Sequence, residues 1–186
     1  MDFAFFEQLS DEEAGAFLEN YRKVGAEHLP DLEQLVARHG AALDFSVGSI
    51  RAAFEVVARQ VDTVPTALDE SLQAWVKNSE SFRAGLYEFS DDSRLLVLRL
   101  SYYLAETLIR ATGQGLQWGV GLADTAVQHQ PVVEGFRGGV QMSPLLVTEN
   151  LLRRLIEEPD PCTADDVDRA VASWRGLVNG ADSQQP

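Results

Sequence analysis

Residues 91–112 have the sequence DDSRLLVLRLSYYLAETLIRAT, which is the strongest helical pattern in the chain. Its apolar residues cover most of the circumference of a helix, and a helix that is apolar nearly all round is buried. These residues are Leu95, Leu96, Val97, Leu98, Leu100, Tyr102, Tyr103, Leu104, Leu108 and Ile109. Because Gly113 follows directly and favours a helix end, we expect residues 91–112 to form the central, buried helix of the fold.

Amphipathic helices are expected before this one. Ser10 and Glu13 have the spacing of a capping box, which predicts a helix start. Pro30 is predicted to begin a second, short helix, since proline favours the first helical position. Gly40 is predicted to end that helix. A third helix is expected to begin at Ser46 or Ser49.

Further helices are predicted on both sides of residues 91–112. Apolar residues recur at helical spacing over residues 68–76, whereas residues 78–90 carry several aromatic residues without a clear period. Ser143 followed by Pro144 predicts another helix start. Thr163, followed by two aspartates, predicts the start of the last helix.

The segment after Gly113 has the character of a small sheet. Seven of the 14 glycines lie in residues 113–139. Apolar and small or polar residues alternate over residues 116–122, which is the period of a strand. Residues 132–136 predict a second strand, and Val140 with Met142 predicts a third. Since an isolated hairpin is marginally stable in water, this sheet is expected to pack against the helices.

These patterns together predict a mainly α fold of the α+β type. We expect about six or seven helices around the buried central helix, with one small antiparallel sheet of two or three strands. A chain of 186 residues is long enough to bury a core of its own. Residues 1–178 are expected to form a single globular domain and residues 179–186 a disordered tail.

The chain is strongly acidic. It has 15 Lys and Arg against 29 Asp and Glu, a formal net charge of −14, and no basic patch of the kind that nucleic-acid-binding proteins carry. Anionic membrane surfaces would also repel it, whereas a basic protein would be attracted. Residues 1–50 hold 10 acids and 3 bases, a net −7. The partner-binding candidates are Glu12, Glu13, Glu19, Glu27, Asp31 and Glu33. The alternative is that the charge only keeps the protein soluble.

Composition also bears on origin and compartment. Cys162 is the only cysteine, so no intrachain disulfide forms and nothing indicates an oxidising compartment. The sequence lacks a signal-peptide pattern and an apolar run of the roughly 18 residues that span a bilayer. We therefore expect a cytoplasmic protein. The 13 arginines against 2 lysines indicate a GC-rich, bacterial genome. The oligomeric state is left open.

No catalytic, metal or cofactor motif is found. His28, His39 and His129 are far apart and have no metal-ligand spacing. No Gly-x-Ser-x-Gly pattern occurs. The glycines of residues 113–121 follow a predicted helix and precede strands, which is the reverse of a dinucleotide-binding loop. We expect no metal and no cofactor, and a protein that is not an enzyme is favoured.

One carboxylate on the central helix needs an explanation. Glu106 lies among apolar residues, where an acid must find a partner or face a cleft. A structural ion pair with Arg110 or Arg99 is one interpretation. The other is a ligand-binding pocket between the central helix and the sheet. That pocket would be lined by Tyr103, Glu106, Trp118 and Glu134.

The sequence Ser101–Glu106, SYYLAE, followed by Trp118 and Pro131-Val132-Val133, resembles uncharacterised bacterial families of unknown function. Those families have a Tyr-Leu-Gly-Glu-like helix, a strand with tryptophan and a Pro-Val-Val strand. Ala105 stands here in place of the glycine, and the resemblance covers about residues 94–155. Some of these families are of the immunity-protein type, without an assigned activity. The resemblance implies an interaction role and supplies no catalytic residue.

Two functions are therefore predicted. The first is an acidic, non-enzymatic binding protein, of immunity or inhibitor type, for a basic partner protein. The alternative is a small-ligand-binding or sensor domain that uses the pocket beside Glu106.

Overall fold

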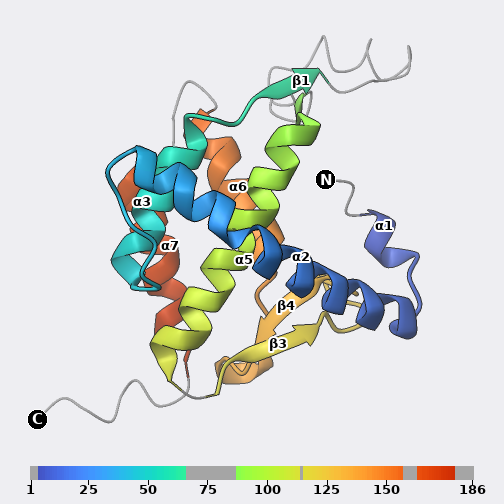
Figure 1. The fold of residues 1–186 in the computed structure, drawn as a ribbon. Helices are drawn as coiled ribbons and strands as arrows, with labels where there is room; N and C mark the ends of the chain where they lie inside the picture. Colours follow the sequence, from blue (N-terminus) through green and yellow to red (C-terminus); the bar gives the residue numbers. More distant parts are fainter. Residues whose placement is uncertain (1–3, 66–86, 114, 157–162, 179–186) are drawn as a thin grey trace, which may run out of the picture.

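The computed structural model describes residues 4–65, 87–113, 115–156 and 163–178 (Figure 1). These residues form six α-helices, one short 3-10 helix and two small antiparallel sheets, which confirms the mainly α class. In chain order the elements are α1 (Ala4–Glu7), α2 (Asp11–Arg38), α3 (Val47–Ala58), β1 (Thr63–Pro65), β2 (Tyr87–Phe89), α5 (Asp91–Thr112), β3 (Gln117–Val120), β4 (Pro131–Glu134), η2 (Arg137–Gly139), α6 (Pro144–Ile156) and α7 (Ala164–Gly176).

The helix α5 has the predicted bounds and lies at the centre of the fold, against α2, α3 and α6 (Figure 1). The side chain of Ser90 caps its start, and Gly113 ends it with a left-handed φ of 70°. Leu100, Tyr103 and Leu108 are fully buried. The surrounding helices therefore fold around α5, as its apolar circumference predicts.

The helix α2 is continuous from Asp11 to Arg38, so the prediction that Pro30 begins a second helix is wrong. Pro30 is exposed, and the carbonyl that loses its N–H partner, that of Ala26, is on an exposed residue where water can replace the donor. Leu32 and Val36, beyond the proline, are fully buried in the core. Their burial holds the second half of α2 in line with the first.

The position of α2 is set by its close approach to α5. Gly25 lies against the ring of Tyr102, and a Cβ at residue 25 would stand 2.4 Å from Tyr102 Cγ. One turn earlier, the Tyr21 hydroxyl is 2.8 Å from the Ser101 hydroxyl in a buried hydrogen bond. From this crossing α2 extends over the sheet formed by β3 and β4 (Figure 1).

The sheet after α5 has two strands. β3 and β4 pair antiparallel from Gln117 opposite Glu134 to Val120 opposite Pro131. The predicted third strand is reduced to a single bridge between Val133 and Met142. The reason is local, because η2 turns the chain between β4 and Met142 with left-handed glycines at residues 138 and 139.

A second ladder was not predicted. β1 pairs antiparallel with β2, from Thr63 opposite Phe89 to Pro65 opposite Tyr87. The sequence indicated only a break in the helical pattern at Val64 and Pro65. Phe89 is buried in the core and joins this ladder to the helices.

The remaining helix starts agree with the sequence. Ser46, not Ser49, caps α3, and α6 begins at Pro144 after Ser143. Thr163 and Asp166 form a capping box at the start of α7. The helix predicted at residues 68–76, Cys162 and the tail at residues 179–186 lie outside the described residues. Among the described helices, none has both the length and the apolar character to cross a bilayer.

Candidate functional site

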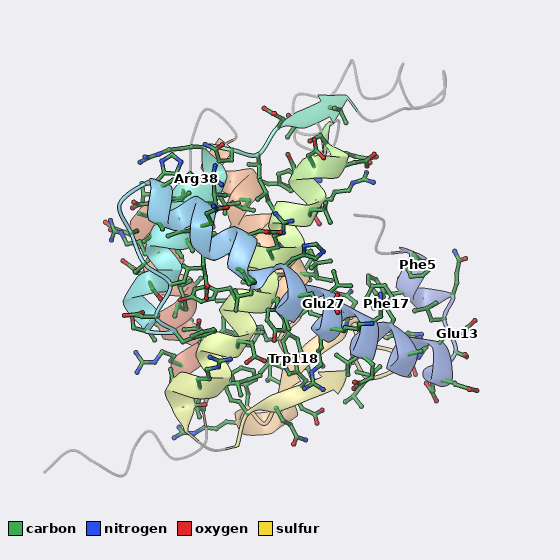
Figure 2. All side chains as sticks on the ribbon, viewed as in Figure 1. Phe5, Glu13, Phe17, Glu27, Arg38 and Trp118 are labelled. Atoms are coloured by element: carbon green, nitrogen blue, oxygen red, sulfur yellow. The ribbon has the colours of Figure 1, made fainter. Side chains whose placement is uncertain are left out.

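The six acids predicted to bind a partner all lie on α2, and all are exposed: Glu12, Glu13, Glu19, Glu27, Asp31 and Glu33. Glu12, Glu19 and Glu27 are seven and eight residues apart, which places them on one side of a helix. Figure 2 shows Glu13 and Glu27 along the helix, with Arg38 at its far end. α2 therefore presents a row of carboxylates, which we call the acidic face.

Charge on this face is concentrated toward its N-terminal end. Residues 4–21, which include α1 and the first turns of α2, contain five acids and no Lys, Arg or His. Farther along α2, Oε1 of Glu27 lies 4.0 Å from Nζ of Lys23. Glu19 lies 3.4 Å from Arg22. Such exposed pairs are weak and exchange readily, so they leave both glutamates able to meet a partner.

Two of the six acids have structural partners. Glu13 closes the capping box, and the Ser10 backbone N–H, then the Ser10 hydroxyl, lower the pKa of its carboxyl. A hydrogen bond with His28, then the charge of Arg99, lower the pKa of Asp31. The four acids that have neither role are Glu12, Glu19, Glu27 and Glu33.

Of the two arginines considered as partners of Glu106, Arg99 pairs elsewhere. Arg99 Nη2 lies 2.9 Å from Asp31 Oδ2 and so joins α5 to α2. Seven residues separate Arg99 from Glu106, which is about 10 Å along a helix axis. That distance is too long for a direct pair, whereas α2 brings Asp31 alongside.

Glu106 instead has two nearer partners. Its Oε1 accepts a hydrogen bond from the indole N–H of Trp118 at 2.9 Å. Its Oε2 accepts from Nη2 of Arg110 at 3.1 Å, the pair expected from the i, i+4 spacing. The Arg110 guanidinium also lies 3.5 Å from the centroid of the Phe45 ring. The carboxylate of Glu106 is thus satisfied within the fold.

Trp118 belongs to an aromatic cluster between α2, α5 and β3 (Figure 2). Its ring stacks on Tyr102 at a centroid distance of 6.0 Å and meets Tyr21 edge-on at 5.6 Å. Burial, more than the charge of Glu106, raises the pKa of Tyr102. Burial also raises the pKa of Tyr21 well above its ordinary value, against the smaller effect of Ser101. Both tyrosines stay neutral, and with Trp118 they pack α2, which carries Tyr21, against α5, which carries Tyr102.

The other two predicted pocket residues point elsewhere. The fully buried hydroxyl of Tyr103 hydrogen-bonds with Ser49 and accepts from the backbone N–H of Phe45. Glu134 accepts from the side-chain amide of Gln117 at 2.8 Å, on the other sheet face from Trp118. Of the four residues predicted to line the pocket, the structure brings only Glu106 and Trp118 into direct contact. The ligand pocket stays a prediction.

His129 has a role that its isolation in the sequence did not indicate. Its buried ring has Nδ1 3.2 Å from the Phe6 carbonyl and Nε2 3.1 Å from Asp11 Oδ1. His129 thus fastens α1 and the start of α2 to the loop before β4. The sequence separation of 118 residues from Asp11 hides this contact.

Within residues 4–65, 87–113, 115–156 and 163–178, no group of three His, Cys, Asp or Glu side chains could hold a metal ion. Comparison of the chain with protein-family models, curated proteins and solved structures finds no match. The acidic face and the buried cluster beneath it are the features from which a function can be argued.

Proposed function

We propose that this chain is a non-enzymatic binding protein, of immunity or inhibitor type, that recognises a basic protein through the acidic face of α2. The observation that carries the proposal is the row formed by Glu12, Glu19, Glu27 and Glu33. These four carboxylates are exposed on one 28-residue helix, and none of them caps or anchors it. Their charge adds to the field of a chain with net charge −14.

The negative charge of the acidic face favours association with a basic partner. A face of one charge sign speeds the encounter with an oppositely charged partner and orients it, and salt weakens that effect. The uncharacterised families that residues 94–155 resemble, some of which are of immunity type, favour the same role. A protein that neutralises a basic partner needs complementary charge on a fixed surface and no catalytic group.

The acidic face is held in place by buried contacts. The close approach of Gly25 to Tyr102 and the hydrogen bond from Tyr21 to Ser101 anchor the middle of α2 on α5. A preorganised face loses little conformational entropy on binding. This rigidity supports recognition of a folded partner.

The test compares two variants of equal charge. The first neutralises the acidic face with Glu12→Gln, Glu19→Gln, Glu27→Gln and Glu33→Gln. The control removes four exposed acids outside α2 with Asp62→Asn, Asp92→Asn, Asp124→Asn and Asp165→Asn. Each tagged protein is used to capture partners from a lysate of the source organism, with low-salt and high-salt washes.

We expect the wild type and the control to retain one basic protein at low salt and release it at high salt. The acidic-face variant should lose that protein, because the charge removed lies at the contact. Equal retention by both variants would contradict the proposal, since total charge alone would then account for binding.

A further inference from the structure

An exposed phenylalanine stands at the end of the molecule where α1 meets α2. Phe5 keeps 47% of its surface exposed, although its neighbour Phe6 is only 1% exposed. The Phe5 ring lies 5.6 Å from Phe6 and 6.1 Å from the half-buried Phe17, measured between centroids. Figure 2 shows Phe5, Phe17 and Glu13 together at this end. Phe6 therefore anchors α1 in the core, and Phe5 extends the aromatic contact to the surface.

Acidic residues follow Phe5 closely in the sequence, and Glu13 lies at the same end of the molecule (Figure 2). The five acids of residues 4–21 are Glu7, Asp11, Glu12, Glu13 and Glu19. Within the described part of the chain, Glu7 and Glu12 form no ion pair. Phe5 is therefore an exposed aromatic residue close in sequence to two unpaired acids, and a partner that is both apolar and basic would complement it.

The surface is also fixed in shape. His129 bonds to the carbonyl of Phe6 and to Asp11, and the capping box of Ser10 holds the first turn of α2. Phe6 packs edge-on against Phe17 at 5.1 Å. Phe5 thus sits on a rigid base, which lowers the entropy lost when a partner covers it.

We infer that α1 and residues 11–19 of α2 form the anchor point for the basic partner, and that they take an apolar side chain flanked by lysines or arginines. We call this surface the N-terminal corner. The inference rests on the proposed function and deepens it, because it names the chemistry of the contacting segment. An aromatic or aliphatic side chain would cover Phe5, and the flanking cations would pair with Glu7 and Glu12.

Charge complementarity selects this occupant over others. A second copy of the chain brings the same five acids and a net charge of −14 to the contact. Anionic lipid and nucleic acid are repelled in the same way. A cationic segment without an apolar residue would leave Phe5 in water and gain only screened charge pairs.

Two synthetic peptides of equal length and charge test the inference. Both are 15-residue peptides with six lysines. One has tryptophan and leucine at its centre and the other has serine at both positions. Binding to the full chain is measured by fluorescence anisotropy at 50 mM and 300 mM NaCl. We expect the wild type to bind the apolar peptide about tenfold more tightly than the serine peptide.

Three variants assign that preference to the corner. Phe5→Ser should abolish it, whereas Phe5→Leu, which keeps an apolar contact, should preserve most of it. Leu122→Ser is the matched control, because Leu122 is 58% exposed outside the corner, and it should keep the full preference. Thermal unfolding of each variant checks that the fold is intact.

The results separate this inference from the function on which it rests. A preference that survives Phe5→Ser, or no preference in the wild type, would overturn the N-terminal corner as an anchor. Equal capture of the partner by the acidic-face variant and its charge control would instead overturn the proposed function. If neither peptide binds, the inference fails, and the capture experiment still decides the proposed function.

Discussion

Replacing Gly25 by alanine tests how the acidic face is held on the fold. Gly25 is the point where α2 approaches α5 most closely, and its Cα faces the Tyr102 ring. The substitution adds one methyl group and leaves the charge unchanged. It therefore probes the helix crossing without altering the acids.

The magnitude follows from the geometry. The added Cβ would lie 2.4 Å, 2.5 Å and 2.8 Å from Cγ, Cδ2 and Cβ of Tyr102. Carbon atoms in contact are normally about 3.5–4.0 Å apart, so the overlap exceeds what a small side-chain rotation relieves. Overpacking of this kind costs about 1–3 kcal/mol. Alanine regains about 1 kcal/mol of helix propensity, which leaves a net loss of about 0–2 kcal/mol.

Urea unfolding followed by circular dichroism measures this loss. Gly15→Ala is the control, because residue 15 lies on the same helix and a Cβ there meets nothing within 4 Å. That variant should gain about 0.5–1 kcal/mol from helix propensity alone. If Gly25→Ala proved as stable as Gly15→Ala, the close crossing of α2 and α5 would be refuted.

Three further outcomes are expected. Thr107→Val should leave stability unchanged or raise it by up to about 1 kcal/mol, because the buried Thr107 hydroxyl has no partner among the described residues. Ser101→Ala, on the same helix, should lower stability by about 1 kcal/mol, because the substitution removes the hydrogen bond between Ser101 and Tyr21. Equal effects of the two substitutions in urea unfolding would contradict this contrast. The pKa of Glu13 is lower in the folded chain than in the unfolded chain. Its carboxylate therefore contributes fully to the free energy of unfolding above the unfolded-state pKa, and this contribution is lost as the pH falls through the folded-state pKa. The stability difference between wild type and Glu13→Gln should thus shrink toward pH 3, and a constant difference from pH 7 to pH 3 would exclude the capping carboxylate as its source. His129→Leu should speed hydrogen exchange in α1 and the first turn of α2 while α5 stays protected; unchanged exchange there would show that His129 does not hold the corner.

Features fixed by neighbouring residues were predictable from the sequence. The bounds of α5 follow from its apolar pattern and Gly113. The capping box at Ser10 and the start of α6 at Pro144 rest on side chains within one helical turn. The ion pair from Arg110 to Glu106 is also local, since four residues separate them.

Features fixed by tertiary contact were not predictable in this way. Pro30 carries a local signal for a helix start, but the burial of Leu32 and Val36 keeps α2 continuous. Arg99 meets Asp31 across a sequence separation of 68 residues, and His129 meets Asp11 across 118. Side-chain spacing along one helix contains no information about such pairs.

The association rate of the captured basic protein tests the central claim most directly. Stopped-flow mixing would compare the wild type, the acidic-face variant and the Asp62/Asp92/Asp124/Asp165 control at two salt concentrations. We predict that the acidic-face variant associates about tenfold more slowly at low salt and loses most of its salt dependence, while the control stays close to wild type. Equal rates for the two variants would contradict recognition through α2.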